Sequence, residues 1–315
     1  MEQTTIVIEP LEINRGTVPR QRKSRLRQFR VQSLFLLPAL VIFTAFVIYP
    51  ILGSLYYSLT DWDGLAPDLH FVGLANFQQL LSDPSVLTDL RNTLIFAAGV
   101  MVLQNGLALL FAIILDGFLR RLTFLRVIFL IPAMISALAI GYIWSYIYTP
   151  EFGFLNTFLG RMGLSAWQQD WLGNSHLTLS SLIFTNSWQF VGFGMVIFLA
   201  GLQAVPAELY EAANIDGTSG WQRFRDITFP LIAPAVTINV VLTMIGSMKV
   251  FDLIFVMTNG GPGDASESLA LRIYKEAFTL NHFGYATAVG IVMSLLILAL
   301  SVFNLRLLRK REVEL

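Results

Sequence analysis

Six long apolar segments constrain this chain more than any other feature of its sequence. They lie near residues 32–59, 93–115, 122–148, 177–203, 231–258 and 285–308. Each is long enough to cross the hydrocarbon core of a membrane, which takes about 20 residues of helix. Of the 315 residues, 55% are hydrophobic and 13% are charged, whereas soluble domains carry about 25% charged residues. The sequence therefore predicts an all-α, polytopic transmembrane bundle with six spans.

Positive charge is unevenly distributed between the segments that join these spans. Sixteen of the 21 Lys and Arg residues fall in the N-terminal arm, the second and fourth loops and the C-terminal tail. With six spans these segments share one side, which the positive-inside rule assigns to the cytoplasm. We expect a cytoplasmic basic arm over residues 1–31, a six-span domain over 32–308 and a cytoplasmic tail over 309–315.

The chain lacks the residue patterns that support catalysis or tight metal binding. It has no cysteine, and His70, His176 and His282 lie in separate loops, which argues against a dense metal site. None of its four lysines follows a glycine-rich loop with phosphate-binding spacing. We therefore expect a protein that is not an enzyme, that has no metal or cofactor of its own and that binds no nucleic acid.

A charged loop over residues 204–230 separates the fourth and fifth spans. Pro206 ends the fourth span, and good helix formers follow over residues 207–214. Gly217 permits a tight reversal because glycine adopts positive φ without steric cost, and Pro230 is expected to end a second short helix at the membrane. Such a loop fits a groove on a partner protein; the alternative is an interfacial helix that lies on the lipid.

The loop resembles a known family motif. The order Glu211-Ala212-Ala213, Gly217, Ile227 and Pro230 resembles the EAA loop of binding-protein-dependent ABC transporter permeases. Other segments resemble the carbohydrate-uptake branch of that family, among them Tyr49-Pro50, Asn92-Thr93-Leu94 and Gly260-Gly261-Pro262. The resemblance covers about residues 30–310 and implies the architecture of a type I ABC importer permease. It assigns ATPase coupling to Glu211, Ala212, Ala213, Asp216, Gly217, Ile227 and Pro230.

The resemblance also implies a function and a set of partners. The expected protein is a permease subunit of an ATP-driven importer for a sugar or oligosaccharide, in a bacterial or archaeal plasma (inner) membrane, with both termini cytoplasmic. Its partners would be a cytoplasmic ABC ATPase dimer that binds ATP and Mg, a second permease subunit, an extracytoplasmic solute-binding protein and membrane lipid.

Alternatives to this interpretation stay open. The large periplasmic insertion of the maltose permease is missing, and the compact form is nearer to glycerol-3-phosphate and general sugar permeases. Glycerol-3-phosphate or a glycerophosphodiester is the alternative solute. From other classes, the chain could be an ion-coupled secondary transporter, for which buried carboxylates are few, or a non-transporting membrane sensor.

Polar residues within the predicted spans mark a candidate solute path, because such groups are costly in a membrane and are often functional. The alternative is that they only join helices. The resemblance selects Asn186, Trp188, Gln189, Phe190 and Ser247, and the physical argument adds Thr243, Lys249 and Asp252, with Gln104, Asn105 and Tyr142 as secondary candidates. Lys249 and Asp252 stand three apart, so either they neutralise each other on one helical face or Lys249 meets an anionic solute.

Overall fold

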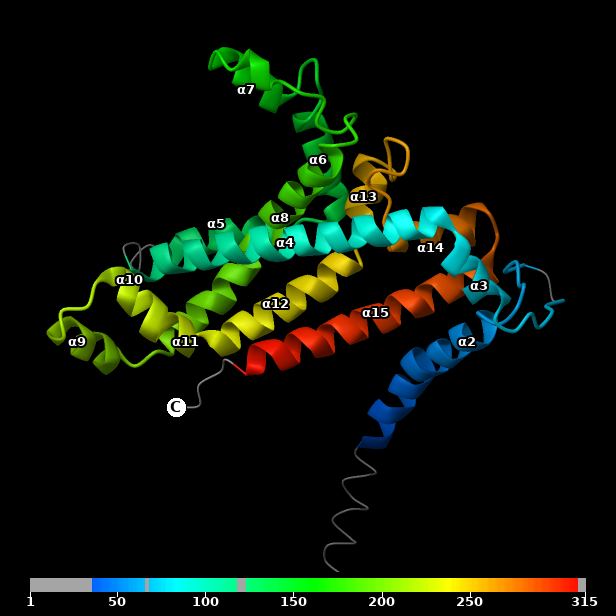
Figure 1. The fold of residues 1–315 in the computed structure, drawn as a ribbon, viewed down its shortest axis with the longest axis horizontal. Helices are drawn as coiled ribbons and strands as arrows, with labels where there is room; N and C mark the ends of the chain where they lie inside the picture. The colour runs from blue at the N-terminus through cyan, green and yellow to red at the C-terminus, as the bar shows by residue number, and fades with distance from the viewer. Residues whose placement is uncertain (1–35, 66–67, 118–122, 311–315) are drawn as a thin grey trace, which may run out of the picture. The chain divides into compact units, whose positions relative to one another are not determined.

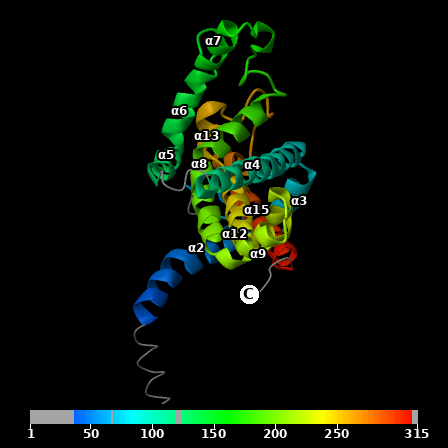
Figure 2. The same ribbon diagram turned by 90° about the vertical axis from the view of Figure 1, so that its left-hand side faces the viewer.

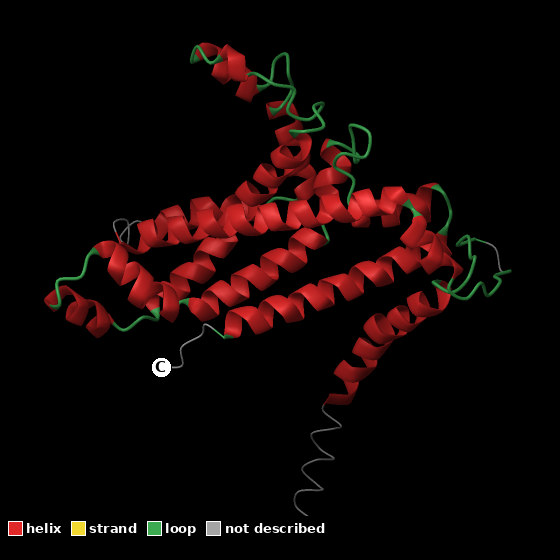
Figure 3. Cartoon of the chain, in the orientation of Figure 1, coloured by secondary structure: helices red, strands yellow, loops and turns green. Residues whose placement is uncertain are grey.

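The computed structural model describes residues 36–65, 68–117 and 123–310 of the chain. The basic arm over 1–31, the start of the first span, residues 118–122 and the tail from 311 lie outside this range, as do the expectations placed on them. Within the described range every regular element is a helix, apart from one isolated bridge between Thr60 and Phe71 (Figure 3). The all-α fold expected from the sequence is confirmed.

Four described helices are long and apolar enough to cross a membrane alone: Leu36–Tyr57, α4 (Pro84–Gly117), α8 (Thr178–Gln203) and α15 (Phe283–Arg309). Two more candidate spans are bent pairs. Phe124–Met134 meets Ala137–Ile147 at 94°, and Gly220–Leu231 meets Ala233–Met248 at 69°. If each bent pair is one span, the described part of the chain has the six spans that the sequence predicts.

Three expected spans differ from the observed helices. α4 begins at Pro84 rather than near residue 93, because its first turns pack against α3 and α14 and stay helical. The third span is not one straight helix, since α5 (Thr123–Met134) contains Pro132 and ends before Ser136, which caps α6 (Ala137–Ile147). The fifth span ends as α12 (Ala233–Met248) and does not continue to residue 258.

The shorter helices complete the element order. They are η1 (Thr44–Ile48), α2 (Tyr49–Tyr57), α3 (Ala75–Ser82), α7 (Phe154–Arg161), η2 (Ser165–Trp167), α9 (Ala207–Ile215), α10 (Gly220–Arg223), η3 (Phe224–Thr228), α11 (Phe229–Leu231), α13 (Asp252–Met257), α14 (Leu269–Tyr274) and η4 (Lys275–Thr279).

By compactness the described residues divide into two units between Gly53 and Ser54. In the second unit α4 packs along α8 and α12, and α12 packs along α15 (Figure 1). α9 and α10 lie at one end of this bundle, with α3 and α14 at the other (Figure 1), and Figure 2 views the chain from the end at which α9 lies. The core between α4 and α8 includes Ala108, Ala112, Met195 and Phe198, all buried. This packing fixes where the loop between α8 and α12 emerges.

Gly192 sets the contact between α5 and α8. A Cβ atom at this position would overlap the backbone carbonyl of Phe129, so the two helices approach too closely for any side chain there. Gly106 on α4 offers a comparison, because a Cβ atom there would meet no atom within 4 Å.

We expect Gly192→Ala to lower the free energy of unfolding by about 1–3 kcal/mol, the usual cost of overpacking. The measurement is the midpoint of thermal unfolding of the purified protein in detergent. Gly106→Ala is the matched control, because both positions are helical and gain the same propensity from alanine. Equal midpoints for the two variants would contradict the close packing of α5 on α8.

Candidate functional site

The loop after α8 folds into a helix, a glycine turn and a second helix. Pro206 caps α9, which covers the residues expected to be helical. Gly217 has φ +66°, the conformation for which glycine was expected. The turn is closed by hydrogen bonds from the Gly217 N–H to the Asn214 carbonyl at 3.2 Å and from the Thr218 N–H to the Ala213 carbonyl at 3.1 Å. The predicted reversal is confirmed.

The second arm of the loop is longer than expected. Ser219 caps α10 in a reciprocal capping box with Gln222, and helix continues through η3 and α11 to Leu231. The helix ends at Leu231, one residue after Pro230, where the sequence predicts its end, and the bend follows at Ile232.

Side chains hold the two arms of this loop together. The guanidinium of Arg223 donates to the Asn214 side-chain oxygen, and the hydroxyls of Tyr210 and Thr228 lie 3.1 Å apart. Each of these contacts joins α9 to the arm that follows Gly217. The loop is therefore one folded unit rather than two independent short helices.

The surface of this loop is charged but carries exposed apolar side chains. Glu211, Ala212, Asp216 and Gly217 are exposed, Ala213 is buried, and Ile227 and Pro230 are partly buried. Two residues that sequence reasoning did not select are the most exposed apolar ones: Ile215 is 87% and Trp221 is 69% exposed. Exposed apolar residues within a polar rim are typical of a protein-binding surface.

Four path candidates lie on α8 and two on α12. Asn186 and Phe190 are partly buried, while Trp188 is 38% exposed and packs edge-on to Trp144 with ring centroids 5.3 Å apart. Gln189 is almost fully buried, and its side-chain amide donates to the Ile135 carbonyl at 3.0 Å.

The path candidates on α4, α6 and α12 vary in their contacts. Gln104 on α4 lies 3.5 Å from the Thr243 hydroxyl on α12, so the structure brings these two together. The Ser247 hydroxyl donates to the Met244 carbonyl within its own helix, and the Asn105 amide does the same with Met101. Tyr142 on α6 is 69% exposed.

Lys249 and Asp252 do not share a helical face, so that prediction is wrong. α12 ends at Met248 and α13 begins at Asp252, which places a break between the two residues. Both side chains are exposed, and the ion pairs of the described residues include none between them. The spacing rule failed because it assumed a continuous helix.

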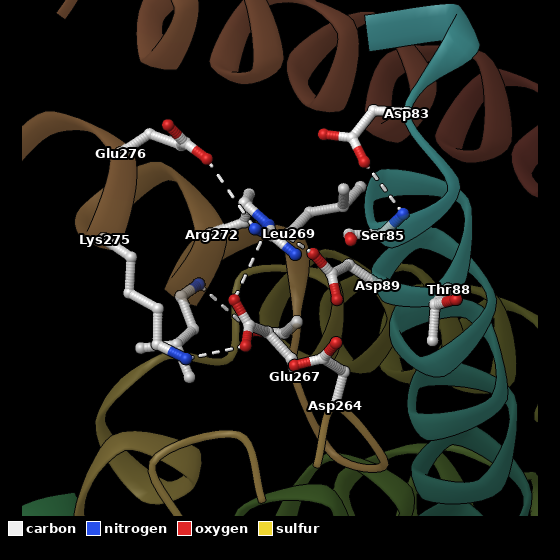
Figure 4. A network of polar contacts seen from close by, with 12 residues as sticks. Asp83, Ser85, Thr88, Asp89, Asp264, Glu267, Leu269, Arg272, Lys275 and Glu276 are labelled. Atoms are coloured by element: carbon white, nitrogen blue, oxygen red, sulfur yellow. Dashed lines mark hydrogen bonds and ion pairs between the residues drawn. The ribbon is translucent and has the colours of Figure 1, made fainter. Parts of the chain in front are cut away.

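At the opposite end of the bundle from α9, an ion cluster joins α14 to α4. Arg272 is 15% exposed and donates to Asp89 at 2.7 Å, while Asp89 itself is fully buried. Arg272 also lies 3.6 Å from each of Glu267 and Glu276, and Lys275 lies 2.6 Å from Glu267 (Figure 4). Sequence reasoning missed this cluster, because 183 residues separate Arg272 from Asp89 and no local pattern links them.

Polar contacts beside the ion cluster attach the loop after α13 to α4. The Asn92 side-chain amide donates to the Asp264 carbonyl at 2.7 Å, and the Leu269 N–H donates to the Thr93 hydroxyl at 3.0 Å. The Asn92-Thr93 pair, noted above only for its resemblance to the family, therefore fastens the loop after α13 to α4.

We expect Arg272→Met to lower the free energy of unfolding by about 3 kcal/mol or more, because it leaves the Asp89 carboxylate buried without its partner. Thermal unfolding of the purified chain in detergent measures this. The double variant Asp89→Asn with Arg272→Met removes both charges and should recover most of the loss. A single variant as stable as the unsubstituted protein would show that the pair is not stabilising the loop.

Comparison with known proteins agrees with this architecture. The family model for the "Binding-protein-dependent transport system inner membrane component" matches residues 104–313. The trehalose/maltose transport system permease protein MalF of Thermococcus litoralis is 33% identical over 290 residues, covering 92% of this chain and 97% of that protein. The sn-glycerol-3-phosphate transport system permease protein UgpA of Agrobacterium fabrum is 33% identical over 279 residues, covering 88% of this chain and 94% of that protein.

A solved structure shares the fold. A chain from the crystal structure of a bacterial ABC transporter involved in the import of the acidic polysaccharide alginate superposes with a TM-score of 0.76 at 22% identity, covering 91% of this chain and 98% of that chain. The protein described here therefore belongs to the family of binding-protein-dependent transport system inner membrane components and is an ABC transporter permease.

Proposed function

Starting from this family membership, we propose that the chain is one permease subunit of an ATP-driven importer that takes up a sugar or oligosaccharide. The observation that carries the proposal is the loop α9–Gly217–α10. It is a folded, exposed unit joined directly to α8 and, through α11, to α12. A loop of that kind offers a cytoplasmic ATPase a binding surface that is attached to two helices of the membrane bundle.

The proposed cycle follows from that attachment. A separate cytoplasmic ATPase dimer binds ATP and Mg and closes, and this chain performs no hydrolysis. Closure moves the segment from Glu211 to Gly217, and α8 and α12 move with it. An extracytoplasmic binding protein delivers the solute, and a second, related permease forms the other half of the pore. Both termini of this chain face the cytoplasm.

The side chains of α8 favour a neutral carbohydrate. Asn186 offers a side-chain amide that can donate and accept, and Trp188 offers a partly exposed ring face for the C–H surface of a sugar. A trehalose/maltose permease is among the relatives. Lys249 is an exposed cation without an ion pair among the described residues, and a relative named for sn-glycerol-3-phosphate keeps that solute as the second candidate.

The test is to isolate the chain by an affinity tag from its native membranes and to identify the proteins that accompany it. We expect an ABC ATPase and a second six-span permease. Reconstituted with the binding protein, the assembly should take up radiolabelled disaccharide, with sn-glycerol-3-phosphate as the comparison solute. A chain that purifies alone and supports no ATP-dependent uptake would contradict the proposal.

Variants of the loop test coupling itself. Glu211→Lys and Gly217→Asp should each lower ATP-dependent uptake by about tenfold or more, the scale of a coupling free energy between two sites, while the chain stays in the membrane at normal levels. Gly163→Asp is the matched control, because Gly163 also has positive φ, at +76°, and open space around its Cβ position. Normal uptake by either loop variant would show that the loop does not couple ATP hydrolysis to transport.

A further inference from the structure

The bend in the third span leaves one backbone carbonyl without its usual helical donor. In a continuous helix the Ala139 N–H would donate to the Ile135 carbonyl. Here Ser136 has extended backbone, with φ −60° and ψ 144°, and its hydroxyl accepts from the Ala139 N–H at 3.3 Å. The cap of α6 therefore takes the donor that the Ile135 carbonyl would have used.

Gln189 on α8 supplies the missing donor. Its side-chain amide lies 3.0 Å from the Ile135 carbonyl oxygen, and the side chain is only 1% exposed. The side-chain carbonyl oxygen of Gln189 (Oε1) is buried with no hydrogen-bond partner among the described residues. Burying a polar atom without a partner is costly, so an apolar side chain would pack here at lower cost. The N–H donor that Gln189 supplies to the Ile135 carbonyl accounts for a glutamine at this position.

The bend therefore has two ways of satisfying the same backbone groups. In the bent state Gln189 donates to the Ile135 carbonyl and Ser136 accepts from Ala139. In a straight state the Ala139 N–H returns to the Ile135 carbonyl, which restores the regular helical bond and needs neither side chain. Pro132, inside α5, weakens the helix on the N-terminal side of the bend, because proline removes a helical hydrogen bond.

We propose that Gln189 is a positioning residue that holds the third span in its bent state, and that it acts through the Ile135 carbonyl rather than on solute. The consequence for transport rests on the proposed function. α8 runs without a break from Gln189 to Gln203 and leads through Pro206 into α9. Movement of the loop that contains α9 and α10 reaches the bend along this one helix and shifts the balance between the bent and the straight state of the third span.

A distance measurement across the bend tests the proposal without any solute. The chain has no cysteine, so spin labels can be attached to cysteines introduced at Val127 on α5 and Tyr146 on α6, which are 59% and 64% exposed. Pulsed electron–electron double resonance on the full transporter in lipid nanodiscs then reports the distance between the labels on α5 and α6. Straightening of the span lengthens it.

Gln189→Leu should shift the population toward the longer separation by about tenfold, the effect of losing one buried hydrogen bond. Ser136→Ala should shift it the same way, because it frees the Ala139 N–H, and it remains a test if Gln189→Leu fails to fold. Thr237→Val is the matched control: it removes a buried hydroxyl that donates to Ala233 within α12 at 3.0 Å. Distances unchanged by Gln189→Leu, or by Ser136→Ala where the first variant does not fold, overturn the proposal.

Uptake kinetics separate positioning from solute contact. We expect Gln189→Leu to lower the maximal rate of disaccharide uptake about tenfold with an unchanged half-saturation concentration. A raised half-saturation concentration with unchanged label distances would make Gln189 a solute ligand and overturn the proposal. If no uptake is found but the distances shift as expected, the role of Gln189 stands and the proposed transport function fails.

Discussion

Backbone N–H and carbonyl groups inside a membrane have no water to bind, so every break in a membrane helix must be satisfied from within the protein. The described part of the chain contains two bent helix pairs that could each be one span, and the packing around them depends on how those breaks are satisfied. At the bend between α5 and α6 a serine hydroxyl and a glutamine amide replace the helical bonds. Because the glutamine amide comes from α8, the bend also requires α8 to lie beside it.

The straight helices and the bent ones consequently have different parts in the architecture. α8 is unbroken, and it carries both the amide that satisfies the bend and the connection to the loop that contains α9 and α10. The loop is itself held together by contacts between its two arms. α8 itself is continuous from Thr178 to Gln203, so it connects this loop to the middle of the bundle without a break in the helix.

Much of this was readable from the sequence, because its signals are local. Apolar length identified the membrane spans, and the α9 helix and the turn at Gly217 followed from helix propensity and from the conformational freedom of glycine. The breaks were not readable in the same way. Pro132 is a weak signal, since membrane helices tolerate proline, and the donor for Ile135 comes from a residue 54 positions away. The Lys249–Asp252 pairing failed for the same reason, because it assumed that helix continued through residues 249–251.

The ion cluster between α14 and α4 was equally hidden, yet it has a mechanical consequence. α4 contains 34 residues and is therefore about 50 Å long, well over the roughly 30 Å of hydrocarbon. Arg272, Asn92 and Thr93 fasten the loop after α13 to the N-terminal turns of this helix. A displacement of that loop is therefore passed to a helix that is longer than a membrane is thick. A single helix in this way connects the loop after α13 to the centre of the bundle.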